Sequence, residues 1–147
     1  MQSPLREDLP VVGTANVRLF AATDAPDTDF TAKLVDVHPD GYAQNVLDRI
    51  VRARFRHGSK FPPSAIHPHR PYEYRIELGN TATIFKAGHR IRLEVSSSNF
   101  PHYARNLNTG ADPSTDATVR AAWQKILHDP AHPSARELPV VRSVRCP

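Results

Sequence analysis

The sequence predicts an all-β protein, built as an antiparallel, jelly-roll-like β-sandwich. Apolar and polar residues alternate in about six to eight short segments, the pattern of strands that bury one face. Turn signals separate these segments about every ten residues. The chain also holds 14 prolines against 6 glycines, which disfavours a helical bundle. Its 147 residues suit one domain, expected to span residues 1–147.

The first half of the chain predicts a strand and then a hairpin. The first ten residues are polar and proline-containing, and we expect them to form a lead-in segment. Alternation predicts a first strand over Thr14–Ala22. Phe30–Val37 and Val46–Arg56 are expected to form a hairpin. Between them, Pro39 and Gly41 occupy the second and fourth positions of a predicted type I turn.

The second half predicts three more strands and a long loop. Pro71–Leu78 has the most regular alternation, Thr81–Phe85 is a short strand or edge segment, and Arg90–Val95 alternates again. Ser96–Gly110 has no periodicity, and a long loop in a small domain is often functional or specifically packed. Val119–Leu127 is ambiguous, because its apolar spacing is helical but its length suits a strand.

Composition argues against several classes of partner. The formal net charge is +4, but acidic residues are interspersed and no dense Lys/Arg block occurs. We therefore expect no nucleic-acid partner. No apolar run is long enough to span a bilayer and no signal segment follows Met1, so we expect no membrane partner and a cytoplasmic location. The single Cys146 excludes an internal disulfide and a cysteine-rich zinc site.

Motifs for nucleophilic or phosphate chemistry are absent from the sequence. None of the six glycines starts a G-x-S-x-G nucleophile elbow, a P-loop or a G-x-G-x-x-G motif. Ser96, Ser97 and Ser98 lie near His102, but adjacency in a loop does not establish a triad. We interpret these serines as partners of backbone groups where a strand ends. The sequence therefore predicts no catalytic residue and no cofactor.

The eight histidines do not predict a metal site. His67 and His69 share one side of an extended chain, but the spacing suggests no third ligand. His128 and His132 are separated by Pro130, which prevents a helix that would align them. We expect surface histidines and no metal ligands.

Two charged groups near the hairpin have ordinary interpretations. The aspartates around the turn lack the spacing of a calcium-binding loop; they are Asp36, Asp40 and Asp48. The arginine row of the second hairpin arm is expected to form its wet face and to pair with carboxylates such as Glu73 or Glu77. That row consists of Arg52, Arg54 and Arg56.

Several segments together resemble one known domain. In order, they are DTDFTAKLVDVHPDG (27–41), RARFR (52–56), FKAGHRIRLEVSSSNFP (85–101), RNLNTG (105–110), HDPAHPS (128–134) and LPVV (138–141). They resemble the C-terminal β-sandwich domain of the X-Pro dipeptidyl-peptidase and cocaine esterase-like (CocE/NonD) serine hydrolases. That family includes glutaryl-cephalosporanic acid acylases and α-amino-acid ester hydrolases. The resemblance covers nearly all of residues 5–141, and it favours an extended Val119–Leu127.

The resemblance implies a galactose-binding-domain-like sandwich that lacks its first strands. In the family, the catalytic serine, aspartate and histidine lie in a preceding α/β-hydrolase domain. This chain therefore resembles a non-catalytic module, expected to be inactive alone. It would pack on a catalytic domain, in cis or in trans, and help to wall the active-site entrance. Exposed apolar surface could also drive homo-oligomerisation.

Nine residues are candidates for a domain interface or a structural loop. Within the loop, asparagine and arginine side chains can cross-link backbone groups. The nine candidates are Asp27, Asp29, Phe30, Ser98, Asn99, Phe100, Arg105, Asn106 and Asn108. The alternative function is an independent carbohydrate- or ligand-binding module, because jelly rolls often serve as lectins. Trp123 is the only tryptophan, which weakens that alternative.

Overall fold

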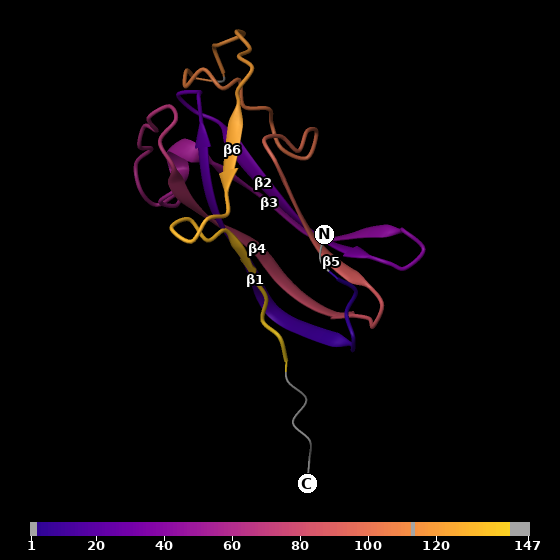
Figure 1. Ribbon diagram of the computed structural model, residues 1–147. Helices are drawn as coiled ribbons and strands as arrows, with labels where there is room; N and C mark the ends of the chain where they lie inside the picture. The colour runs from indigo at the N-terminus through magenta and orange to yellow at the C-terminus, as the bar shows by residue number, and fades with distance from the viewer. Residues whose placement is uncertain (1–2, 113, 142–147) are drawn as a thin grey trace.

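The computed structural model describes residues 3–112 and 114–141, so Cys146 lies outside the described residues. Two antiparallel sheets stack as a sandwich (Figure 1), which confirms the predicted fold class. One sheet has the order β4-β1-β6, with β7 also paired to β1, and the other has the order β3-β2-β5. The strands are β1 (Leu9–Thr23), β2 (Asp29–Val37), β3 (Ala43–Arg52), β4 (Tyr72–Phe85), β5 (Arg90–Ser96), β6 (Gln124–Leu127) and β7 (Ala135–Glu137).

The longest pairing joins β1 to β4. β1 begins at Leu9, earlier than predicted, so the end of the expected lead-in segment belongs to this strand. The two segments predicted on either side of Gly79 form one continuous strand. The register shifts where Gly79 faces Ala15, and the positive φ of Gly79 (113°) suits a β-bulge. Glycine here therefore marks a bulge rather than the end of a strand.

The hairpin of β2 and β3 forms as predicted, with one difference at its end. The backbone N–H of Gly41 donates to the carbonyl of His38 at 3.0 Å, which closes the predicted turn. β3 ends at Arg52, and a short 3₁₀ turn over Ala53–Phe55 follows. The predicted strand over Val46–Arg56 is therefore too long, because alternation continues into a segment whose backbone turns.

The ambiguous segment before β7 is extended and not helical. Only Gln124–Leu127 forms a strand, β6, which pairs antiparallel with the end of β1. Residues 119–123 have no regular structure. Ser134 joins the neighbouring segments, since its hydroxyl accepts from the N–H of Phe20 at 2.9 Å and donates to the carbonyl of Leu127 at 2.6 Å. Pairing with β1 thus decides between the two conformations that the spacing left open.

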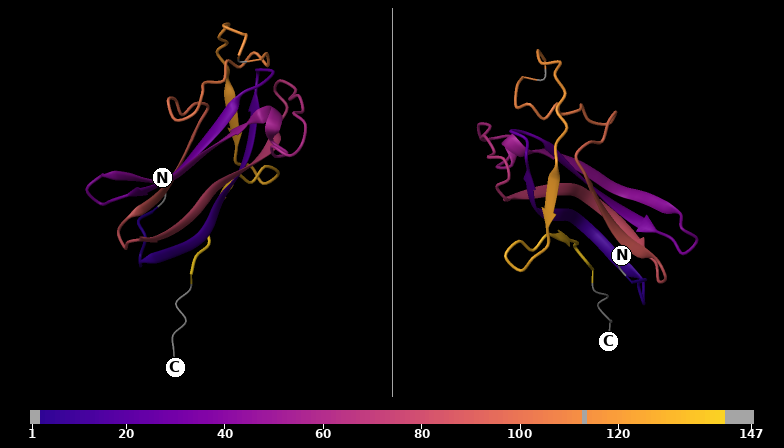
Figure 2. Two further views of the ribbon diagram at one scale, coloured as in Figure 1. Left: turned by 180° about the vertical axis from the view of Figure 1, so that it is seen from behind. Right: turned by 45° about the horizontal axis from the view of Figure 1, so that its top comes forward.

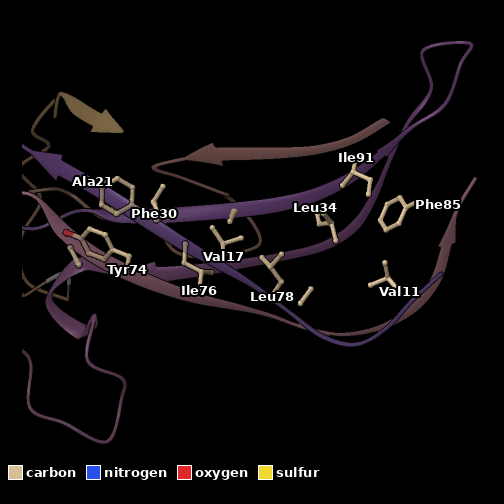
Figure 3. Packing of buried hydrophobic residues seen from close by; sticks show 14 of the residues in the cluster. Val11, Val17, Ala21, Phe30, Leu34, Tyr74, Ile76, Leu78, Phe85 and Ile91 are labelled. Atoms are coloured by element: carbon tan, nitrogen blue, oxygen red, sulfur yellow. The ribbon is translucent and has the colours of Figure 1, made fainter. Parts of the chain in front are cut away.

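The core lies between the inner faces of the two sheets (Figure 3). Alternate residues along these strands are buried, from Leu19 on β1 to Leu34 on β2 and Ile76 on β4. The rings of Phe30 and Tyr74 cross between the sheets, with centroids 4.8 Å apart. Burying each such side chain stabilises the fold by about 1.5–3 kcal/mol.

The two ends of the sandwich carry different loops (Figure 2). The segment between β5 and β6, here called the long loop (residues 97–112 and 114–123), lies at the end where β2 begins. The tip of the β2–β3 hairpin and the turn between β4 and β5 lie toward the other end. Across the described residues, no helix has the length and apolar character needed to cross a membrane.

Candidate functional site

Two buried aspartates lie at the corner that leads into β2. Asp27 and Asp29 are each 1% exposed. Asp29 pairs with the last residue of β3, with 3.0 Å between Asp29 Oδ1 and Arg52 Nε. Asp27 pairs with an arginine of the 3₁₀ turn that follows, with 2.9 Å between Asp27 Oδ2 and Arg54 Nε. The hydrogen bond to Asp29 raises the pKa of Arg52. Phe30 follows directly and points into the core. These pairs offset the cost of burying the carboxylates.

Asn106 connects the long loop to both aspartates. Its Nδ2 donates to Asp29 Oδ1 at 2.8 Å and to Asp27 Oδ2 at 3.2 Å, and the residue is only 8% exposed. Its Oδ1 accepts from the backbone N–H of Asn108 at 2.9 Å. One buried amide therefore holds the middle of the loop against the start of β2.

Further hydrogen bonds hold the loop on either side of this contact. Asn108 has a positive φ of 61° and donates from Nδ2 to the carbonyl of Arg120 at 2.9 Å. Arg54 donates from its guanidinium to the carbonyls of Gly110 and Ala111, each at 3.5 Å. The guanidinium that pairs with a buried carboxylate thus also contacts the loop backbone.

The remaining candidates lie outside this cluster. Asn99 donates to Asp48 Oδ2 on β3 at 2.9 Å, so it ties the start of the loop to the hairpin. Ser98 and Arg105 are exposed. Phe100 is 69% exposed. The structure therefore brings together Asp27, Asp29 and Asn106, with Asn108 beside them. Phe30 lies in the core, and Ser98, Phe100 and Arg105 lie on the loop surface.

The predicted partners of the arginine row are wrong. In place of Glu73 or Glu77, the first two arginines pair with the buried aspartates described above. Arg56 donates to the carbonyl of Ser64 at 2.8 Å, and its guanidinium lies 4.5 Å from the ring centroid of Tyr72. Arg52 faces Asp29 because β3 pairs with β2. Arg54 lies in the 3₁₀ turn after β3 and Arg56 at its end, and alternation along a strand does not anticipate this turn.

The serines after β5 act on the local backbone. The hydroxyl of Ser96 donates to the carbonyl of Ser98 at 3.2 Å and accepts from its N–H at 3.4 Å. The ring of His102 packs against Tyr103, with centroids 4.6 Å apart. In residues 3–112 and 114–141, no hydrogen bond is found between a serine hydroxyl and a histidine ring. These contacts are those of a strand end.

The aspartates considered for calcium have separate partners. Asp40 Oδ1 accepts from the N–H of Tyr42 at 2.9 Å within the turn. Asp48 accepts from Asn99, while Asp36 contacts His89. The three carboxylates thus serve three different contacts.

Large apolar side chains are exposed on the long loop. Trp123 is 83% exposed, Phe100 69% and Val119 63%. Their backbone is nevertheless positioned, since the N–H of Trp123 donates to Asp24 Oδ1 at 2.9 Å. Sequence patterns did not distinguish these residues from core residues, because exposure depends on what the rest of the fold covers.

Comparison with known proteins identifies the family. Residues 1–135 match the family described as the X-Pro dipeptidyl-peptidase C-terminal non-catalytic domain. The chain belongs to this family. It is 44% identical over 140 residues to cocaine esterase of Rhodococcus sp. (strain MB1 Bresler), covering 94% of this chain and 24% of the esterase. The resemblance predicted from the motifs is confirmed.

Two solved structures share the fold closely. An α-amino acid ester hydrolase is 32% identical with a TM-score of 0.85, covering 95% of this chain and 24% of that one. An aminopeptidase from a marine sediment Thaumarchaeota archaeon is 34% identical with a TM-score of 0.86, covering 96% and 25%. The chain thus spans about a quarter of the length of these larger hydrolases.

Proposed function

We propose that this chain is the non-catalytic module of a serine hydrolase that acts on ester, amide or peptide bonds. It docks through its long loop on an α/β-hydrolase catalytic domain and helps to shape the entrance to the active site there. The observation that carries this proposal is the exposure of Trp123, Phe100 and Val119 on a loop whose middle is anchored by Asn106.

Exposed aromatic side chains favour docking over a solvent-facing role. Apolar groups at the surface gain free energy when a partner covers them, at about 25 cal/mol per Å² of area removed from water. Exposed apolar patches commonly mark interaction sites, and the three side chains belong to one loop. Asn106 and the two buried aspartates hold the loop before any partner arrives. A positioned loop loses less conformational entropy on binding.

A chimera tests this function directly. The matching quarter of the Rhodococcus cocaine esterase would be replaced by this chain, and esterase kcat/KM would be measured. We expect the chimera to be active and the isolated chain to leave an activated ester unhydrolysed. Trp123→Ser with Phe100→Ser should lower kcat/KM of the chimera by at least about tenfold, equivalent to about 1.4 kcal/mol.

Ile84→Ser is the matched control for this experiment. Ile84 is 50% exposed and lies near the end of β4, toward the other end of the sandwich from the long loop. We expect it to change kcat/KM of the chimera by less than about twofold. Equal effects of the control and the loop variants would contradict the proposal. So would inhibitor-sensitive ester turnover by the isolated chain.

Carbohydrate binding is the second candidate function. The exposed ring of Trp123 favours it, because an accessible indole face can stack on a sugar ring. A glycan array separates the two functions. Specific binding of the chain to a glycan that is abolished by Trp123→Ser, together with an inactive chimera, would support a ligand-binding module. The cytoplasmic location, the single-domain extent and the homo-oligomer expected from the sequence stay predictions.

A further inference from the structure

Three metal-ligating side chains meet near the end of the sandwich opposite the long loop. Asp36 lies on β2, His38 follows that strand in the hairpin turn, and His89 lies in the turn between β4 and β5. One ligand atom from each, two imidazole nitrogens and a carboxylate oxygen, lies within 4.8 Å of the other two. The cluster does not involve the anchored loop or its aromatic residues.

The fold brings these groups together where the apolar stripe of β2 ends. Alternate residues of β2 point between the sheets, and Asp36 follows Leu34 on that inner face. The β4–β5 turn carries the chain from one sheet to the other, and it places His89 beside Asp36 although they are 53 residues apart. Asp36 is 7% exposed.

The contacts within the cluster suit a shared ligand. His89 Nδ1 lies 2.9 Å from Asp36 Oδ1 and 3.1 Å from Oδ2. His38 Nε2 lies 3.9 Å from Asp36 Oδ2, and the two imidazole rings are 4.2 Å apart between centroids. His38 Nε2 is cut off from solvent and makes no hydrogen bond. It therefore faces the carboxylate without a partner that satisfies it.

Backbone contacts hold both turns in place. The hairpin turn is closed by the N–H of His38, which donates to the carbonyl of Tyr42 at 2.8 Å. The other turn is held by Asp8, which accepts from Lys86 Nζ and from the N–H of Ala87, each at 2.8 Å. The carbonyl of His89 accepts from the N–H of Leu5 at 2.8 Å. The ligand-bearing backbone is thus fixed without a metal.

We propose that Asp36, His38 and His89 form a binding site for a divalent transition-metal ion of the zinc class. Two imidazoles and one carboxylate are a common donor set for zinc, with a fourth position left for water or another ligand. Zn–N and Zn–O bonds of about 2.0–2.1 Å place tetrahedral donors about 3.3 Å apart. The distances from the Asp36 carboxylate oxygens to His89 Nδ1 (2.9 Å) and to His38 Nε2 (3.9 Å) lie on either side of that value. Small side-chain rotations would therefore bring the three atoms into position. The ion would link the β2–β3 hairpin turn to the turn between β4 and β5.

Zinc binding to the tag-free chain, stripped of metal, tests the proposal. Isothermal titration with Zn²⁺ should show one ion per chain with micromolar or tighter affinity. Co²⁺ should bind competitively and give the visible absorption of a tetrahedral nitrogen–oxygen site. His38→Ala is the most informative variant, because the Nε2 atom that it removes makes no hydrogen bond. It should weaken zinc binding at least about tenfold, as should His89→Ala.

His132→Ala is the matched control. His132 forms a similar histidine–aspartate pair, with Nδ1 2.9 Å from Asp129 Oδ1, and it belongs to no three-residue ligand group in the described part of the chain. We expect its zinc affinity to equal that of the unchanged chain. Zinc should also raise the unfolding temperature of the unchanged chain and of His132→Ala, but not of His38→Ala.

Each alternative outcome would overturn the proposal. Absence of zinc binding to the unchanged chain would do so. Unchanged binding in His38→Ala and His89→Ala would place the ion elsewhere, for example at the exposed His67 and His69. If His89→Ala does not fold, as judged by circular dichroism, His38→Ala alone decides, with His38→Gln as a second variant that keeps a polar side chain.

Discussion

Replacement of Asn106 by alanine tests whether the buried amide anchors the long loop. The change removes two hydrogen bonds to carboxylates, at 2.8 and 3.2 Å, and one to the N–H of Asn108. Hydrogen bonds to charged groups contribute about 1.5–3 kcal/mol each. Because Asp27 and Asp29 keep their arginine partners, neither is left alone. We therefore expect a loss near the lower bound for two such bonds, about 3 kcal/mol.

Urea denaturation followed by circular dichroism measures this loss. With an m-value of about 2 kcal/mol per molar, a loss of about 3 kcal/mol lowers the midpoint by about 1.5 M. Asn45→Ala is the matched control, since Asn45 is exposed on β3. Its free energy of unfolding should stay within about 0.5 kcal/mol of that of the unchanged chain. Asn106→Asp keeps the shape but adds a third carboxylate, so it should destabilise the chain more than alanine does.

Limited proteolysis separates a local effect from a global one. Arg105 is exposed and directly precedes Asn106, so loss of the anchor should speed tryptic cleavage after Arg105. Unfolding free energy of Asn106→Ala within about 0.5 kcal/mol of the unchanged chain would refute the anchoring argument. Unchanged cleavage after Arg105 would refute it as well.

Two further predictions concern the hydroxyl groups of Tyr74 and Ser134. Burial raises the pKa of Tyr74 to about 12 from 10.0, so its stabilisation is complete below pH 10 and falls by about 2.7 kcal/mol as pH rises toward 12. Since the Tyr74 hydroxyl makes no hydrogen bond, Tyr74→Phe should be no less stable than the unchanged chain at pH 7. Above pH 10, the urea midpoint of Tyr74→Phe should fall less steeply than that of the unchanged chain. An equal fall in the two proteins would contradict this. Ser134→Ala removes hydrogen bonds to Phe20 and Leu127 and should lower the free energy of unfolding by about 2 kcal/mol in the same urea assay. The control, Ser114→Ala at an exposed position, should change it by almost nothing. Similar midpoints for the two variants would argue against this prediction.

Strand positions were predictable where one face is buried along a regular strand. Alternation over 72–78 places Tyr74 and Ile76 on one side, and both are buried. Alternation gave the wrong strand ends where the backbone departs from regular pairing. Gly79 stands at a bulge inside β4, and the residues after Arg52 enter a 3₁₀ turn. Both departures depend on neighbouring strands, which a local pattern does not describe.

The candidate loop residues came from a resemblance, and their contacts came from the structure. Asn106 and Asp29 are 77 residues apart, and only the packing of the long loop against the start of β2 brings the amide to the carboxylate. The same holds for the arginines, whose buried partners were not the carboxylates expected from strand alternation. The cluster of Asp36, His38 and His89 was missed because the two histidines lie in separate turns. Local spacing suggested only two pairs, His67 with His69 and His128 with His132.

Alternating hydrophobicity specified how many layers this chain forms and which side chains face the core, because burial of one strand face is a short-range property with a period of two residues. The turn chemistry of Pro39 and Gly41 likewise specified one hairpin locally. Which polar groups meet was left to the tertiary arrangement, since the carboxylates, the amide and the imidazoles described here find their partners on a neighbouring strand, turn or loop and not along their own strand. The exposure of Trp123 belongs to the same class: it depends on which surfaces the fold covers.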